Sequence, residues 1–442
     1  MRLIDDAERR ARLGRRHALA PQHRVADALA AIRAMTVLHA TEPATPYLSL
    51  FARIDSFTRA DLDDALFASR SLVKQLAMRR TLFVFPRELL PAAVSGPSAR
   101  VARQEYGRLV TDLERSGVTG DGASWLATAR EAVLARLAGG AELSATELRE
   151  GLAELAGRVS WYEHKPYGQV LHVAPRVLAW LSANGDLVRG RNAGHWRITR
   201  PLWTRMDDWL GAPVDRCEAS EGYAELVAAY LRTFGPVTER DLVWWFGATK
   251  GAMRQALSDL NAAQVRLERA QAGWVLPDDV DPEPPVEPWA ALLPALDPTA
   301  LGWKERDFYL APDFYSAIFD RSGNCGTTAW WDGKIVGQHP AGLVPLQPHL
   351  HRVQVRQRVT HRALGRAEPP QQVPFGDRAE GAQVARDELG VSHALLAPVD
   401  RGSEPVVRPR PQRPGDPPVP GVAAAHQIPV RRQPGQHPRR DV

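Results

Sequence analysis

The sequence is poor in the features that mark secreted, membrane-embedded and disulfide-stabilised proteins. Only two of its 442 residues are cysteines, Cys217 and Cys325, too few for a cysteine-rich zinc site or a disulfide scaffold. No apolar run approaches the roughly 18 residues that a membrane-spanning helix needs. The charged N-terminus also lacks the apolar core of a secretory signal. We therefore expect a soluble, cytoplasmic protein of bacterial type that does not enter a membrane.

The sequence also lacks the short motifs of several enzyme classes. It contains no HExxH, GxSxG, P-loop or GxGxxG pattern. Zinc hydrolase, ATPase and dinucleotide-binding functions therefore have no support in the sequence. We accordingly expect no metal site and no cofactor.

Tryptophan, tyrosine and lysine are absent from the C-terminal tail, residues 338–442, which holds 17 of the 36 prolines. Its net charge is +6, whereas residues 1–337 have a net charge of −1. Nucleic-acid binding by the body must therefore depend on local clusters of basic residues. Such a proline density cannot sustain a helix or a central strand. Two interpretations stay open: a disordered basic arm that holds phosphates, or the product of a frame shift in a GC-rich, degenerate gene.

A helix-start signal, Ser/Thr-x-x-Asp/Glu, occurs three times at domain-sized intervals, beginning at Thr58, Ser144 and Thr238. In the third copy, we expect Thr238 and Thr249 to cap two helices that Gly247 separates. Strand-like residues follow both. This order of two helices, a tight turn between them and a hairpin is typical of a winged helix.

The other two copies show a similar order of elements. In the second copy, strands are expected over residues 187–189 and 195–198, after the helices. In the first copy, we expect helices from 58 to about 69 and from 72 to 80, and then a strand over 81–85. Capping boxes are common and three can occur by chance, but the shared downstream order favours three related units.

The last part of the body is β-prone. It follows a proline- and acid-rich linker, and its Asp332-Gly333 pair is a strong hairpin signal. The predicted fold class is therefore α+β, with tandem winged-helix units and a small C-terminal β domain that is cut short where the tail begins. The expected boundaries are 1–120 for the first unit with the candidate catalytic segment, 121–215 for the second unit, 216–281 for the third unit, 289–337 for the β domain and 338–442 for the tail.

Basic residues lie where winged helices would present them to DNA. Arginine in particular suits phosphates and guanine edges. The alternative is that surface helices carry arginines anyway and that many winged helices contact proteins. The candidate DNA contacts on these elements are Lys74, Arg79, Arg80, Arg191, Lys250 and Arg254.

The segment from residue 35 to residue 53 is the densest in polar and aromatic groups. An apolar helix is expected to end in a polar run with two prolines, and a second apolar stretch ends at Arg53, a further candidate DNA contact. His39 and Thr41 are two residues apart, so an extended backbone would place both on one side, with Glu42 alongside. An imidazole and a hydroxyl could then face a common point. The alternative is that His39 and Thr41 only cap a helix end.

Several stretches resemble one known family. They are residues 39–53, Ala77-Met-Arg-Arg-Thr-Leu-Phe83, Phe234-Gly-Pro-Val-Thr through Trp244-Trp245, Gly302-Trp-Lys and Trp330-Trp-Asp-Gly. Together they resemble the winged-helix DNA-binding family that includes the AlkZ-like and YcaQ-like alkylpurine DNA glycosylases. The resemblance covers about residues 20–337 and stops at the tail. It implies tandem winged helices and a β domain that cradle DNA.

The resemblance also implies an activity, with one departure. Family members carry a catalytic Gln-x-Gln or Gln-x-Asp pair just before the Pro-Tyr-Leu-Ser run, and by position the pair here is His39 and Thr41. His39 would then orient or deprotonate water, and Thr41 would hold it. The predicted function is a monofunctional, metal-independent DNA glycosylase, a monomer acting on alkylated or crosslinked double-stranded DNA. The alternative is a non-catalytic regulator or damage binder in which both residues are structural.

Overall fold

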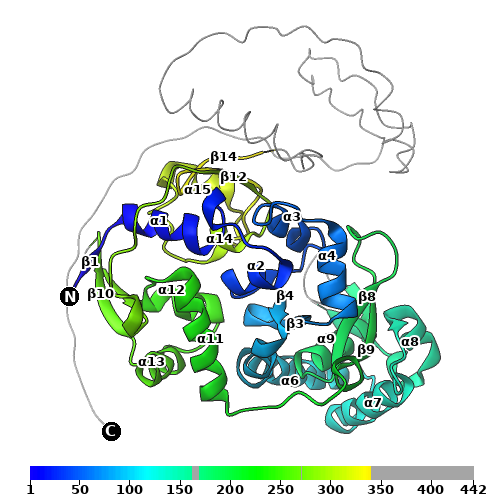
Figure 1. The fold of residues 1–442 in the computed structure, drawn as a ribbon. Helices are drawn as coiled ribbons and strands as arrows, with labels where there is room; N and C mark the ends of the chain where they lie inside the picture. Colours follow the sequence, from blue (N-terminus) through cyan, green and yellow to red (C-terminus); the bar gives the residue numbers. More distant parts are fainter. Residues whose placement is uncertain (162–168, 270, 340–442) are drawn as a thin grey trace, which may run out of the picture. The chain divides into compact units, whose positions relative to one another are not determined.

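The structure is a computed structural model that describes residues 1–161, 169–269 and 271–339, all within one compact unit (Figure 1). The described residues combine many helices with four three-stranded sheets and one two-stranded sheet. The predicted α+β class is therefore confirmed. The tail, and with it both interpretations of residues 340–442, lies outside the described residues. No helix in the described ranges is long and apolar enough to cross a membrane.

The first group of elements builds a three-stranded sheet of order β2–β4–β3. Thr58 forms the predicted capping box with Asp61, and α4 begins there. The elements are α2 (Ala28–Ala34), β2 (Leu38–His39), α3 (Thr45–Phe51), α4 (Arg59–Asp63) with its π-helical continuation η2 (Asp64–Ala68), β3 (Leu72–Ala77) and β4 (Thr81–Pro86).

The predicted helix over residues 72–80 is wrong. Residues Leu72–Ala77 form β3 and pair antiparallel with β4, because their apolar side chains are buried against both faces of the sheet. Arg79 and Arg80 have φ angles of +54° and +61°, so they form the tight turn between the two strands. It follows that Thr58 opens the third helix of its group, whereas the other two capping boxes open second helices.

The second group has the sheet order β5–β9–β8 and contains an additional hairpin, β6–β7. The predicted strand over residues 195–198 is wrong. Those residues lie in the loop between β8 and β9, where the Asn192 side chain bonds to the carbonyls of His195 and Ile198. The elements are α7 (Gly122–Arg136), β5 (Leu143–Ser144), α8 (Ala145–Gly151), β6 (Arg158–Trp161), β7 (Gln169–His172), α9 (Ala174–Ala183), β8 (Leu187–Asn192) and β9 (Pro201–Arg205).

The third group follows its predicted order closely. Thr238 and Thr249 cap consecutive helices, and Gly247 between them has a φ of +59°. Val237 forms a bridge to Trp274, which places a one-residue strand between the first two helices. The elements are α11 (Ala219–Phe234), α12 (Glu239–Phe246), α13 (Lys250–Asp259), β10 (Ala263–Leu267) and β11 (Ala272–Val275), with β1 (Leu3–Ile4) added parallel to β10.

The last sheet joins β12 (Ala290–Leu293), β13 (Thr328–Trp331) and β14 (Lys334–Gly337) in chain order. Asp332 and Gly333, with φ angles of +46° and +74°, make the predicted hairpin turn. The remaining α-helices are α1 (Asp6–Arg16), α5 (Leu90–Ala93), α6 (Ala99–Arg115), α10 (Met206–Leu210), α14 (Pro298–Leu301) and α15 (Tyr315–Ile318).

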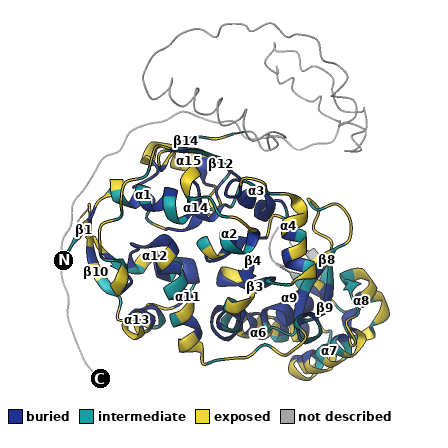
Figure 2. Cartoon of the chain, in the orientation of Figure 1, coloured by how far each residue is buried: buried dark blue, intermediate teal, exposed yellow. Residues whose placement is uncertain are grey.

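Buried residues lie where these groups meet as well as inside each group (Figure 2). One cluster of buried apolar side chains extends from Leu13 to Ile335 and includes residues of every group. In it, Tyr230 and Phe234 of α11 pack on Trp245 of α12, with ring centroids 4.7 and 6.3 Å from the indole. The groups therefore share one core, and the sheet that carries His39 is held from both sides.

Candidate functional site

His39 is the last residue of β2 and is paired with Phe83 of β4. Its ring packs edge-on against the Phe83 ring, 5.4 Å away, and only 8% of the residue is exposed. The buried Nδ1 atom has no hydrogen bond to any described residue. Burial, and then the positive charge of Arg79, lowers the pKa of His39 to about 4. The imidazole is therefore neutral near pH 7 and has a free nitrogen.

Thr41 lies beyond the strand. The pairing with β4 ends at Ala40, whose N–H donates to the carbonyl of Leu82 at 2.8 Å, and a bend begins at Thr41. Thr41 and Glu42 are both exposed. The expected same-side placement assumed an extended backbone, and that backbone stops before Thr41. A joint role for the two side chains stays a prediction.

Positive charge without a nearby carboxylate lies beside His39. The guanidinium of Arg79, in the β3–β4 turn, stacks on the Trp244 ring at 4.2 Å, and that of Arg306 lies 5.1 Å from the same ring. Arg306 is only 2% exposed, and its Nε and one terminal nitrogen have no hydrogen bond within the described ranges. Its other terminal nitrogen donates to the Tyr315 hydroxyl at 2.8 Å. In the described part of the chain, neither arginine forms an ion pair with a carboxylate.

Sequence reasoning named Arg79 but missed Arg306 and Trp244. Trp244 was named only within a stretch that resembles the family, and Arg306 is 227 positions further along the chain than Arg79. No local pattern connects the two arginines, because only the packing of α12 against the β3–β4 turn brings them to one ring.

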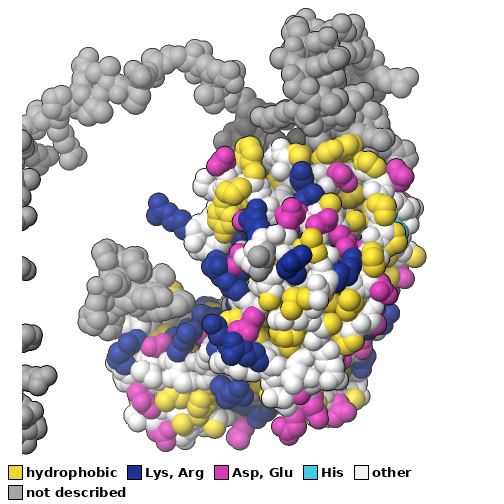
Figure 3. Space-filling view, turned by 90° about the vertical axis from the view of Figure 1, so that its left-hand side faces the viewer, with side chains coloured by type: hydrophobic (Ala, Val, Ile, Leu, Met, Phe, Trp, Pro, Cys, Tyr) yellow, Lys and Arg dark blue, Asp and Glu magenta, His cyan; other side chains and the backbone are white. Residues whose placement is uncertain are grey.

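A basic pocket of about 280 Å³ adjoins this cluster, and Arg79 lines both. Arg80, Arg100 and Arg108 also line it, around the buried Glu105. Glu105 pairs with Arg80 at 3.0 Å and with Arg108 at 2.9 Å. One carboxylate thus faces four arginines, so the pocket has a net positive charge. In Figure 3, Lys and Arg side chains gather around a hollow in the left-hand part of the face shown.

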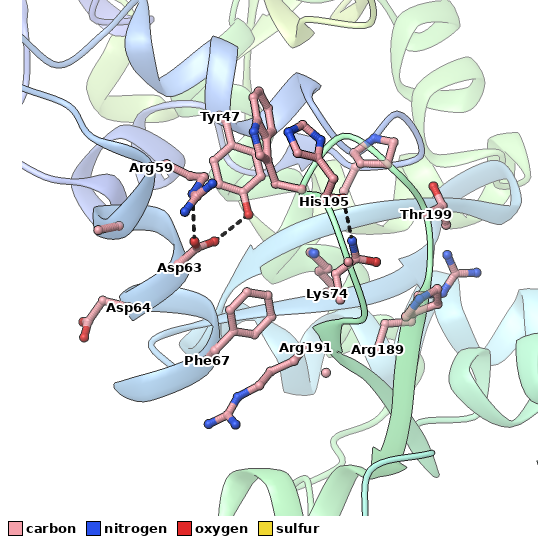
Figure 4. A pocket seen from close by; sticks show the side chains of 18 of the residues that line it. Tyr47, Arg59, Asp63, Asp64, Phe67, Lys74, Arg189, Arg191, His195 and Thr199 are labelled. Atoms are coloured by element: carbon pink, nitrogen blue, oxygen red, sulfur yellow. Dashed lines mark hydrogen bonds and ion pairs between the residues drawn. The ribbon is translucent and has the colours of Figure 1, made fainter. Parts of the chain in front are cut away.

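Lys74 and Arg191 line a separate cavity of about 640 Å³ between α4 and the β8–β9 loop, which we call the α4–β8 cavity (Figure 4). Lys74 is paired with Val84, whereas His39 is paired with Phe83, so the two side chains leave opposite faces of the sheet. Burial, and then Arg189, lowers the pKa of Lys74 to about 8. The structure thus separates Lys74 from Arg79 and Arg80, which the sequence had grouped on one helix.

Arg53 requires a correction. It is 0% exposed and forms a bidentate ion pair with Asp297, with both nitrogen–oxygen distances at 2.9 Å. Its other donors bond to the carbonyls of His17 and Ser49 and to the Thr299 hydroxyl. All of its donors are therefore used inside the protein. The expected DNA contact by Arg53 is wrong, since the side chain joins α3 to the start of α14.

Lys250 and Arg254 are exposed on α13, and Arg254 pairs with Glu239 at 2.7 Å. Their role as DNA contacts stays a prediction. Among the described residues, no group of three or more His, Cys, Asp or Glu side chains could hold a metal ion.

The sequence model of the family described as "DNA glycosylase AlkZ-like" matches residues 32–341. No curated protein matches the chain significantly in sequence. Among solved structures, the Streptomyces sahachiroi DNA glycosylase AlkZ is similar, with a TM-score of 0.61 and 20% sequence identity, covering 83% of this chain and 98% of that one. At this identity, the structural likeness speaks for the fold.

Proposed function

The chain belongs to the AlkZ-like DNA glycosylase family, and on this premise we propose that it hydrolyses the N-glycosidic bond of alkylated purines in double-stranded DNA. The observation that carries the proposal is His39. At the position where the family keeps its first glutamine, the chain has a neutral, almost buried imidazole with a nitrogen that no described residue pairs. The charge of Arg79, which no carboxylate of the described ranges neutralises, acts on this imidazole.

In the proposed reaction, the bond between deoxyribose C1′ and the purine nitrogen breaks, and its electron pair leaves with the base. Alkylation has already made that base cationic, so the departure needs no proton from the protein. A water oxygen bonds to C1′ and releases a proton. Because an imidazole with a pKa of about 4 is a weak base, we assign His39 to orienting the water, while the proton passes to solvent. Thr41 would hold the same water from the bend that follows.

The arginines would hold the DNA backbone around the reacting nucleotide. Arg79, Arg80 and Arg306 supply positive charge close to β2, where each bound phosphate would act as a counter-ion. Lys250 and Arg254 on the exposed side of α13 would add further backbone contacts.

We also propose that the three groups of elements are winged-helix units, in residues 1–120, 121–215 and 216–281, followed by a β domain in 289–337. The support is a recurring order of helix, strand, helix, helix and two strands, with the first strand paired to the last one in each group. The β6–β7 hairpin is then an insertion in the second unit.

The test is release of alkylated purines, such as 7-methylguanine, from methylated duplex DNA without added metal. His39→Ala should lower the rate about 10²–10⁴-fold while DNA affinity and the unfolding midpoint stay unchanged. His39→Gln restores the family's amide and should keep or raise activity. His23→Ala, which removes a histidine outside this site, is the matched control. DNA binding with no base release from the wild-type chain would instead favour the non-catalytic damage binder.

A further inference from the structure

The α4–β8 cavity contains cationic groups for which the described residues provide no counter-ion. Within those residues, Lys74 forms no ion pair and no hydrogen bond, and its Nζ lies 5.4 Å from the centre of the Phe67 ring. The buried Nε of Arg189 likewise has no hydrogen bond there. Desolvated cations of this kind are costly unless an anion compensates them. The burial that lowers the pKa of Lys74 is a sign of this cost.

The carboxylates of the cavity compensate these cations only in part. The charge of Asp63 opposes the lowering of the Lys74 pKa, but by less than burial and Arg189 lower it. Asp63 already accepts a hydrogen bond from the Tyr47 hydroxyl at 2.6 Å and lies 3.4 Å from Arg59. Asp64 lines the cavity but is exposed to solvent. The charged side chains that line the cavity are Arg59, Lys74, Arg189 and Arg191 against Asp63 and Asp64, an excess of two positive charges.

Aromatic rings line another part of the same cavity. Trp196 packs edge-on against Tyr47, with centroids 5.0 Å apart, and beside His195 at 5.8 Å. Flat indole and imidazole surfaces are the groups on which proteins stack nucleobases. Figure 4 shows Tyr47 and His195 in the upper part of the view and Lys74 and Arg189 below them. A volume of about 640 Å³ is within the usual range for small-molecule sites.

We propose that the α4–β8 cavity binds a nucleoside monophosphate unit, with its phosphate on Lys74 and Arg189 and its base against Trp196. The site is distinct from the one at His39, because the two lie on opposite faces of the β2–β4–β3 sheet. Such a unit can come from a free mononucleotide or from the phosphorylated end of a DNA strand. Binding there does not depend on base release, so this inference stands apart from the proposed function.

The test is binding of deoxyadenosine monophosphate to the full chain, measured by calorimetry, with deoxyadenosine and inorganic phosphate as partial ligands. Lys74→Met keeps the length of the side chain and should weaken monophosphate binding about 10-fold or more, since it removes a charge-assisted hydrogen bond to the phosphate. In Trp196→Ala, the monophosphate should bind no more tightly than inorganic phosphate alone. His23→Ala and Arg232→Met, which lie outside the cavity and outside the proposed DNA site, should bind as the wild type does.

The two sources are distinguished with a 5′-phosphorylated single strand and the same strand without its phosphate. Tighter binding of the phosphorylated strand than of the free monophosphate points to a strand end, and the reverse points to a free nucleotide. Equal affinity of a folded Lys74→Met variant and the wild type for the monophosphate would overturn the proposal. So would a monophosphate that binds no better than deoxyadenosine. Neither outcome would bear on base release, which is measured separately.

Discussion

Two buried arginines in this protein have opposite surroundings. Arg53 is 0% exposed, and every donor of its guanidinium is bonded, two of them to Asp297. Arg306 is 2% exposed but, among the described residues, has two nitrogens without a hydrogen bond and lies against aromatic rings and a hydroxyl. Burial alone therefore does not distinguish a structural arginine from a functional one. Under the proposed function, the presence of a carboxylate does, because an uncompensated buried cation favours an incoming anion.

The largest effect is expected at Arg53. Arg53→Met should destabilise the fold by about 3–5 kcal/mol, since it leaves Asp297 buried without its partner. In the wild type, burial acts to raise the pKa of Asp297. Arg53 and the hydrogen bonds that Asp297 accepts outweigh it and hold this pKa below its usual range. Urea unfolding monitored by circular dichroism measures the loss. The double variant Arg53→Met, Asp297→Leu should recover part of it, and strict additivity of the two single losses would contradict the pairing.

Substitution of Arg306 is expected to have a smaller effect on stability than substitution of Arg53, and to lower the affinity for DNA. Arg306→Met should cost much less stability than Arg53→Met, because no carboxylate is left unpaired. DNA affinity should fall, and the log–log slope of affinity against salt should drop by about one unit for each phosphate that the variant no longer binds. Gel-shift titration at several salt concentrations measures both. Arg232→Met, which removes an exposed charge paired with Asp278, is the matched control. Lys250→Met is a separate test of the proposed α13 contact.

The smallest expected effect is that of the Arg79 charge on the pKa of His39. If neutral His39 orients water, base release should stay constant from about pH 8 to pH 5.5 and fall as pH drops toward about 4, where the imidazole protonates. Arg79→Met removes the second cause of the lowered pKa, so the fall should begin at a higher pH. Initial rates of base release by the wild type and by Arg79→Met, measured from pH 8 to about pH 4, test this prediction. A midpoint near the ordinary histidine pKa of about 6.5 in the wild type would show that His39 is not in this environment during the reaction.

Local signals in the sequence predicted local structure well. Thr238, Thr249 and Gly247 cap and separate their helices as expected, and Asp332-Gly333 turns between β13 and β14, because each of these signals acts within a few residues. The predicted helix over residues 72–80 was wrong because a short apolar run fits a buried strand and a helix equally. Only pairing with β4, a contact outside the segment, decides between them.

The candidate site could be predicted only in part. His39 was singled out by its spacing from Thr41, and the family resemblance gave it a catalytic role. Its burial against Phe83 follows from a pairing across 44 positions that no local pattern reveals. Arg53 was misassigned because its partner, Asp297, is 244 positions away. Lys74 was predicted to lie on one helix with Arg79 and Arg80. It lies instead on β3, and its side chain leaves the face of the β2–β4–β3 sheet opposite to His39 and lines the α4–β8 cavity.

The strand β1 has a consequence for the order of folding during synthesis. Leu3 and Ile4 pair with Arg266 and Leu267, so most of the described chain must leave the ribosome before this strand can form (Figure 1). Until then, Ile4 and the apolar edge of β10 that it covers both stay without a partner. Leu3 and Ile4 are thus synthesised long before the strand with which they pair. Deletion of β1 would leave the edge of β10 open to pairing with another chain.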